Sequence, residues 1–296
     1  MIAFGSAITK PDVYGRCAKR GIDLVAEPDS VVLEHPSAGT LFEAYNAILD
    51  RAAELDGLEA LVLAHQDAEI ATPAFCSVVR TALADPEVGL VGCAGSVDVR
   101  SISWWEGSVT CASFTQRYED MGGGELPAFS WDWDDAPPYA RLGEVETLDG
   151  FLLVLPPWTV RNVRFDVDLG SPMHGYDLDY CLQVRAAGRK VITAGFRAVH
   201  HHDLYAVSDP DEWMAAHAAV AEKWEGREPG LRPWPGSWRE RALRAEAEVA
   251  AARAYEHETL LDLEARARYV ERSLEEAVGS ISWKLTAPLR RGGLAA

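Results

Sequence analysis

Residues 61–70 read LVLAHQDAEI, an apolar run that passes directly into His65, Gln66 and Asp67. The apolar run begins at residue 58, and a continuous run of this length is typical of a strand that is covered on both faces. Ligands bind an open parallel sheet at the carboxyl ends of its strands. The stretch therefore predicts a buried strand that delivers polar side chains to a site.

The residues around this strand alternate between strand and helix patterns. Strands are predicted at residues 2–8, 22–27, 31–35, 58–64 and 88–95, and helices after Pro11, over 39–55 and over 72–85. Thr72 and Pro73 are suited to the N-cap and the first position of the last helix. The alternation predicts an α/β fold, in which a Rossmann-like, mostly parallel sheet is flanked by helices.

The second half of the chain is less regular. Residues 100–146 are predicted to form a loop-rich insertion with strands around 108–114. Further strands are expected at 147–157 and 190–195, and further helices at 177–188 and from about 209. We expect three parts: a domain over residues 1–225, a Pro/Gly-rich linker at 226–238 and a helical tail at 239–296.

In the tail, apolar residues repeat at alternate spacings of three and four, which is the pattern of a coiled coil. They are Leu260, Leu263, Ala267, Val270, Leu274, Ala277 and Ile281. The pattern predicts packing on the chain's own domain or pairing in a homodimer. The alternative is peripheral contact with a membrane surface, which Trp283, Lys284, Arg290 and Arg291 would suit.

The net charge of the chain is −18, and the excess of acid lies in residues 1–238, because the remainder holds ten basic and ten acidic side chains. An acidic body disfavours nucleic-acid binding, which depends on neutralising phosphates, and it is compatible with a site for divalent cations. The five cysteines form no CxxC pair. They indicate reduced thiols and a cytoplasmic location. No apolar run is long enough to span a membrane.

Two pairs of acidic or imidazole side chains are candidates for chemistry. His65 and Asp67 stand two residues apart, so in an extended segment they point the same way and can face one ion; the alternative is a turn-forming or capping pair. Asp177 and Asp179 open a predicted helix, where free N–H groups and the helix dipole stabilise carboxylates. Capping is the alternative interpretation, and we favour it for Asp179.

Two further groups follow the same reasoning. His200 and His202 share a face if their segment is extended, and neutral imidazole is a common metal ligand; the alternative is a surface loop. Trp104 and Trp105 lie in the loop-rich insertion, as do two later tryptophans. Tryptophan faces stack on sugars, so these residues are candidates for an acceptor site, or else for a small satellite core or an interface.

Taken together, these segments resemble family 2-type glycosyltransferases with the GT-A fold, in particular the bacterial glycosyltransferase-like family 2 branch. The resemblance covers roughly residues 2–225, and YDLDYCLQVRAAG is its most specific block. The segments that carry it are AYNAILDRA (44–52), LVLAHQDAEI (61–70), GLVGCAG (89–95), TLDGFLLVLPP (147–157), HGYDLDYCLQVRAAGRKV (174–191) and VHHH (199–202).

The resemblance implies a metal site for Mn²⁺ or Mg²⁺. The family's Asp-x-Asp motif falls on residues 65–67, so Asp67 is the expected direct ligand. His65 departs from the motif, so the resemblance leaves three alternatives for it: contact with the metal, contact with the ribose, or neither. A late histidine often completes such a site, and His200 and His202 are the candidates.

The resemblance also implies donor-binding and catalytic residues. The family's Glu-Asp pair falls on Tyr176 and Asp177, so only the second acid matches, and Asp177 resembles the general base. Asn46 matches an asparagine of the donor pocket, and Asp149 with Gly150 matches a segment that approaches the sugar. Asp179 is a candidate on the acceptor side. The family's usual IPTYN opening is absent.

We therefore expect an inverting, metal-dependent glycosyltransferase that uses a nucleotide-sugar in bacterial polysaccharide or glycoconjugate synthesis. Its acceptor would be a saccharide or a lipid-linked saccharide at the inner membrane face. The first alternative is a non-catalytic carbohydrate-binding or scaffolding protein, suggested by His65 and Tyr176. The second is a nucleotidyltransferase, which would normally carry a Gly-rich basic loop after the first strand. The segment with Lys10 and Arg16 lacks those glycines.

Overall fold

Contacts within the chain of this computed structural model divide it into two units, Met1–Pro233 and Trp234–Ala296. The division lies inside residues 226–238. The structure describes residues 1–97, 99, 108–111, 114–118, 124–126, 142–201, 209–224, 227 and 238–280.

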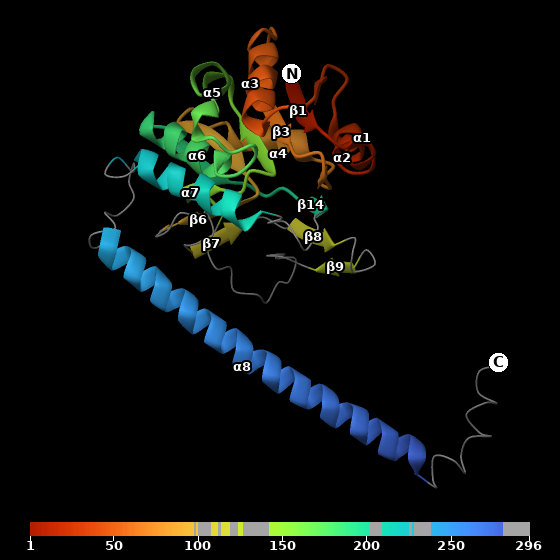
Figure 1. The fold of residues 1–296 in the computed structure, drawn as a ribbon. Coiled ribbons are helices and arrows are strands. Elements are labelled where there is room, and N and C mark those ends of the chain that lie inside the picture. The colour runs from red at the N-terminus through yellow and green to blue at the C-terminus, as the bar shows by residue number, and fades with distance from the viewer. Residues whose placement is uncertain are drawn as a thin grey trace, which may run out of the picture. The chain divides into compact units, whose positions relative to one another are not determined.

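The first unit is built on a seven-stranded sheet (Figure 1). In spatial order its strands are β10 (Glu144–Val145), β13 (Lys190–Thr193), β5 (Val88–Gly92), β12 (Leu152–Leu155), β3 (Ala60–Ala64), β1 (Ile2–Ile8) and β2 (Val31–Pro36). Strands β2, β1, β3, β5 and β13 run in one direction, while β10 and β12 are antiparallel to their neighbours. The predicted α/β fold with a mostly parallel sheet is confirmed.

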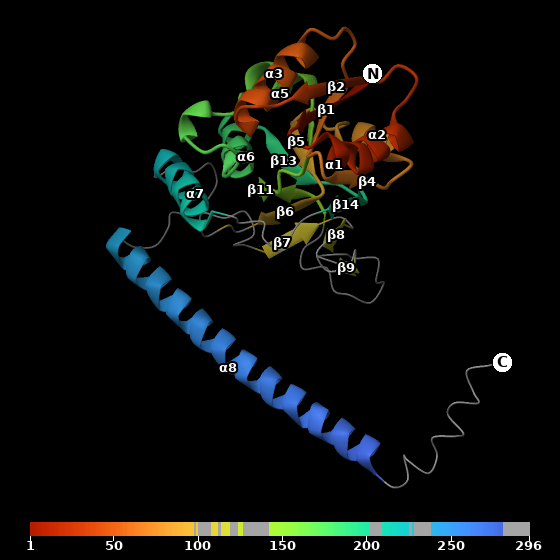
Figure 2. The same ribbon diagram turned by 45° about the vertical axis from the view of Figure 1, so that its right-hand side comes forward.

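Helices cover both faces of this sheet (Figure 2). One face packs against α2 (Ala18–Val25) and α4 (Phe75–Ala82). The other packs against α3 (Leu41–Ala53), α5 (Pro157–Asn162) and α6 (Tyr176–Ala186). Strand β3 contributes to both layers, because Val62 faces the first group of helices and Leu61 and Leu63 face the second. The apolar run that ends at His65 is therefore buried on both sides, as predicted.

Two smaller sheets lie beside the central one. The first consists of β11 (Thr147–Leu148), β6 (Ala94–Val97) and β7 (Ser108–Cys111). The second consists of β4 (Ala68–Ile70), β14 (Ala198–His201), β8 (Phe114–Tyr118) and β9 (Gly124–Leu126). The other described elements of this unit are α1 (Pro11–Arg16), the short 3₁₀ helix η2 (Val167–Leu169) and α7 (Pro210–Trp224).

Two local predictions are wrong. Residues 22–27 were expected to form a strand, but Ile22 and Val25 belong to α2 and turn inward together with Ala18. A short apolar run fits either period, and helical packing against the sheet decides it here. Thr72 does not cap α4, which begins three residues later; its hydroxyl instead accepts a hydrogen bond from the backbone N–H of Arg197.

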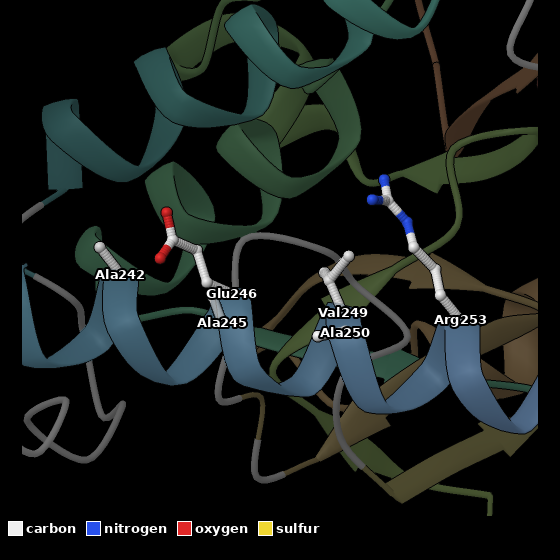
Figure 3. A pocket seen from close by; sticks show the side chains of 6 residues that line it. All are labelled: Ala242, Ala245, Glu246, Val249, Ala250 and Arg253. Carbon is white, nitrogen blue, oxygen red and sulfur yellow. The ribbon is translucent and has the colours of Figure 1, made fainter.

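The second unit contains the 42-residue helix α8 (Trp238–Gly279). Leu260, Leu263, Val270 and Leu274, which belong to the predicted heptads, are each more than half exposed. Nearer its start, six side chains on one face of α8 line a pocket (Figure 3): Ala242, Ala245, Glu246, Val249, Ala250 and Arg253. Among the described helices, α8 included, none has the length and apolar character that crossing a membrane requires.

Candidate active site

The carboxyl end of β3 meets three other segments at one end of the strands of the sheet. His65 and Asp67 follow β3 directly, and the His65 backbone N–H donates to the carbonyl of Phe151 over 2.9 Å. Because β12 runs antiparallel to β3, the residues that precede β12, Asp149 and Gly150, reach the same edge. The start of α6 and strand β14 complete the site, so four segments far apart in sequence contribute to it.

His65, Asp67 and His200 form one cluster. The Nδ1 atom of His65 lies 3.9 Å from Oδ1 of Asp67, and Nε2 of His200 lies 3.7 Å from the same oxygen. One ligand atom from each of the three lies within 4.8 Å of the others. The His200 ring is fixed by stacking on Phe151, with ring centroids 4.7 Å apart. The predicted grouping of His65, Asp67 and His200 is therefore present.

His65 and Asp67 come together through a different backbone conformation from the one predicted. An extended segment was expected, but the Ala68 N–H donates to the His65 carbonyl and closes a turn. The Gln66 side chain, between these two residues, contacts the loop after β1. Its Oε1 accepts from the backbone N–H groups of Thr9 and Lys10, at 3.0 and 2.8 Å, and thereby ties the loop after β1 to this turn.

The electrostatics of the cluster favour an anion between two imidazoles. Burial opposes ionisation of Asp67, but the interaction with His200, helped by His65, outweighs it and holds the pKa of Asp67 below its ordinary range. Burial also lowers the pKa of His200, and Asp67 more than compensates, so the pKa of His200 is raised overall. A carboxylate with two imidazoles is a donor set that suits a divalent transition-metal ion, and the three side chains remain 12–30% exposed, which leaves access.

Asp177 and Asp149 are partly buried carboxyl groups at the same end of the strands. Asp177 Oδ2 accepts from the Gly150 N–H at 3.2 Å, and Oδ1 accepts from the Leu178 N–H at 2.8 Å. Burial nevertheless raises the pKa of Asp177 above its ordinary value. Burial, with help from the charge of Asp177, also raises the pKa of Asp149 to about 6. Both groups are thus stronger bases than exposed aspartates.

Tyr176 contacts the cluster directly. Its hydroxyl lies 2.6 Å from Nε2 of His65, within hydrogen-bond distance. The sequence marked Tyr176 and His65 only as two separate departures from a family motif. Their contact spans 111 residues of chain, and neither residue type alone indicates it.

The chain matches a known protein family. A family model described as "Glycosyltransferase like family" matches residues 7–223, which is more than half of the chain. The chain belongs to this glycosyltransferase-like family. Over 207 residues this glycosyltransferase is 29% identical to the streptomycin biosynthesis protein StrF of Streptomyces griseus; the match covers 69% of this chain and 67% of StrF.

Among solved structures, the glycosyltransferase is similar to GalNAc-T7, whose crystal structure contains UDP, GalNAc and Mn²⁺. The TM-score is 0.50 at 10% identity, and the match covers 77% of this chain and 48% of that one. This glycosyltransferase thus spans less than half of the GalNAc-T7 chain. At this identity the likeness shows the fold alone, and that fold is the GT-A fold.

Three residues expected in the site have other contacts. Asn46 makes two hydrogen bonds to the backbone of Phe165, donating through Nδ2 at 2.8 Å and accepting through Oδ1 at 3.0 Å. Its amide therefore holds α3 against the segment before η2, and its predicted place in the donor pocket stays a prediction. Gly150 provides room: a side chain there would collide with the hydroxyl of Tyr176.

Asp179 is 1% exposed and joins α6 to α7. Its Oδ1 contacts Lys223 Nζ and Trp224 Nε1, each at 2.7 Å, and its Oδ2 accepts from Gln183 at 2.7 Å. These contacts stabilise the packing of α6 against α7 rather than capping α6, and the acceptor role of Asp179 stays a prediction. The remaining candidates, His202, Trp104 and Trp105, lie outside the described residues.

Proposed function

We propose that this glycosyltransferase moves a sugar from a nucleotide-sugar to a hydroxyl acceptor with inversion, and that it needs a divalent ion. The supporting observation is that two kinds of group meet at one sheet edge. His65, Asp67 and His200 offer nitrogen and oxygen ligands, and Asp177 offers a partly buried carboxyl group whose pKa is raised. The three ligands can hold an ion that neutralises the leaving diphosphate, and the carboxyl group can take the proton of the acceptor hydroxyl.

The ion in this proposal is Mn²⁺ or Mg²⁺, held by His65, Asp67 and His200. When bound, such an ion neutralises the negative charge that gathers on the departing diphosphate. Both imidazoles must be neutral to bind a metal, and the carboxylate must be ionised. The low pKa of Asp67 meets the last requirement. His202 follows two residues after His200 and is proposed as a further ligand.

Asp177 is proposed as the general base. The acceptor oxygen forms a bond to the anomeric carbon while the bond from that carbon to the diphosphate oxygen breaks. Asp177 takes the hydroxyl proton as the new bond forms. A single displacement of this kind inverts the configuration at the anomeric carbon. The backbone N–H groups of Gly150 and Leu178 hold the carboxylate in place. Asp149, at the same edge, is proposed to face the donor sugar.

The biological setting is also a proposal. We place the enzyme in the cytoplasm, with a saccharide or lipid-linked saccharide as acceptor and bacterial polysaccharide or glycoconjugate as product, and we place Trp104 and Trp105 on the acceptor side. Its similarity to StrF, a protein named for streptomycin biosynthesis, makes sugar-bearing small molecules a second acceptor class to test.

We also propose that α8 forms a parallel coiled coil with a second copy of the chain. The exposed heptad residues, Leu260, Leu263, Val270 and Leu274 among them, would be covered by that pairing. The charges favour the parallel orientation, because it places Arg266 of one helix beside Glu271 of the other. The antiparallel orientation would instead bring Glu264 and Glu271 together. Packing of the helix on the chain's own domain and contact of the chain's end with a membrane surface remain the alternatives.

A thermal-shift panel tests the proposed function. UDP-, GDP- and dTDP-linked sugars are added with and without Mn²⁺ to the wild type, to Asp67→Asn and to the exposed control Asp56→Asn. A ligand that binds only the folded state raises the melting temperature. We expect one nucleotide class to give an Mn²⁺-dependent rise in the wild type and the control but not in Asp67→Asn. No rise with any nucleotide would support the scaffold alternative.

A further inference from the structure

The ring of Tyr176 is packed among aromatic side chains next to the cluster of His65, Asp67 and His200. It is 5% exposed and packs against Phe42, Tyr45 and Phe165, with ring centroids 6.1, 5.9 and 6.0 Å away. Gly150 lies so close to its hydroxyl that an added Cβ atom would overlap it. Packing and this close approach therefore fix where the hydroxyl points, and it points at Nε2 of His65.

This contact determines which ring nitrogen of His65 lies toward Asp67. Nε2 is 2.6 Å from the Tyr176 hydroxyl, and Nδ1 is the ring nitrogen on the side of Asp67, 3.9 Å from Oδ1. A neutral imidazole carries one proton, so one nitrogen donates and the other accepts. If Nδ1 is to offer its lone pair to an ion shared with Asp67, the proton must reside on Nε2.

The Tyr176 hydroxyl can accept that proton's hydrogen bond. Burial keeps the pKa of Tyr176 well above 10, so the hydroxyl stays neutral. Metal-bound histidines generally donate their second ring N–H to a fixed partner, which sets their tautomer and orientation. His200 has its own orienting contact, the stacking on Phe151. Tyr176 serves His65 in the corresponding way.

We propose that Tyr176 is a positioning residue for the metal site: its hydroxyl holds His65 as the Nε2–H tautomer and directs Nδ1 toward an ion shared with Asp67 and His200. The inference rests on the proposed metal site. It makes His65 a ligand through Nδ1, and it assigns Gly150 the task of leaving room for the hydroxyl. In this proposal Tyr176 orients the His65 ring, and it affects the metal site only through His65.

The first test measures binding of Mn²⁺ alone by electron paramagnetic resonance. Tyr176→Phe removes the hydroxyl and keeps the ring. The matched control is Tyr180→Phe on the same helix, because the buried Tyr180 hydroxyl has no hydrogen-bond partner among the described residues. Loss of an orienting partner typically weakens metal binding 10–100-fold. We expect a weakening of about that size in Tyr176→Phe and none in Tyr180→Phe.

The second test reads the tautomer itself, which a purely structural role would not set. Nitrogen-15 NMR of histidine-labelled protein without metal, with the His65 signals assigned from His65→Gln, should show the Nε2–H tautomer. Tyr176→Phe should shift it toward a mixture. An Nδ1–H tautomer in the wild type, or unchanged Mn²⁺ affinity in Tyr176→Phe, contradicts the role of Tyr176 alone. A wild type that binds no Mn²⁺ contradicts the proposed metal site as well.

Discussion

The backbone N–H of Gly150 donates a 3.2 Å hydrogen bond to Oδ2 of Asp177. The bond joins the segment before β12 to the first turn of α6, and it fixes a carboxyl group whose pKa is raised by burial. A base must be both basic and correctly placed, and this contact supplies the placement without neutralising the group. Replacing the Asp177 carboxyl group by an amide therefore tests its role as a base.

Asp177→Asn should abolish catalysis and leave the fold and donor binding intact. The asparagine carbonyl oxygen can keep one of the two backbone hydrogen bonds, from Gly150 or from Leu178, but an amide cannot take a proton from the acceptor. General-base catalysis typically contributes about 10²- to 10⁴-fold, so we expect turnover of the donor to fall at least about 100-fold. Hydrolysis or transfer is measured with the nucleotide-sugar that the thermal-shift panel identifies. A fall of less than about fivefold would exclude Asp177 as the base.

Asp149 should make stability depend on pH. Its folded pKa of about 6 lies above the value of about 3.9 for an unfolded aspartate, so the folded state binds the proton more tightly. Stability is therefore lost as pH rises from about 4 through about 6. Asp149→Asn should raise the free energy of unfolding by about 2–3 kcal/mol at pH 8 and change it little at pH 4.

Urea unfolding at the two pH values, with a chelator present, measures this difference. The control is the exposed Asp56→Asn, which should have no pH-dependent effect. An effect of Asp149→Asn that is equal at both pH values would show that the pKa of the Asp149 carboxyl group is not raised in the folded state.

Asn46→Ala should lower stability and spare the donor site. The substitution leaves the N–H and C=O of Phe165 without their partner, and an unsatisfied buried polar group costs about 1–3 kcal/mol. Urea unfolding should show that loss, while the Mn²⁺-dependent thermal shift with the donor keeps its size. A stable variant that has lost the shift would support the predicted place of Asn46 in the donor pocket.

The α8 proposal predicts a dimer that depends on the heptad face. Light scattering after size-exclusion chromatography should show a dimer for the full chain and a monomer for Leu263→Asp combined with Leu274→Asp. Tyr269→Asp, at an exposed position off that face, is the control and should remain dimeric. A monomeric wild type would contradict the pairing and leave packing on the chain's own domain and membrane contact as the alternatives.

Much of the fold could be predicted from the sequence, because the buried strands are apolar throughout and alternate with amphipathic helices. The run before His65 is the clearest example. Short segments failed where one pattern fits two structures, as at Ile22 and Val25. In the site, chain proximity predicted His65 with Asp67, and the family resemblance added His200. The contacts of Asn46 and Asp179 could not be predicted, because their partners, Phe165 and Lys223, are distant in sequence. A backbone carbonyl, a backbone N–H or a side-chain charge leaves no pattern in the sequence that points to its partner.

The most direct measurement of the metal site is anomalous X-ray scattering at the manganese absorption edge from crystals soaked in Mn²⁺. We predict one strong peak bounded by Nδ1 of His65, Oδ1 of Asp67 and Nε2 of His200, absent from crystals of Asp67→Asn. A peak elsewhere, or none at saturating Mn²⁺ in well-ordered crystals, would contradict a metal-dependent site at this edge of the sheet.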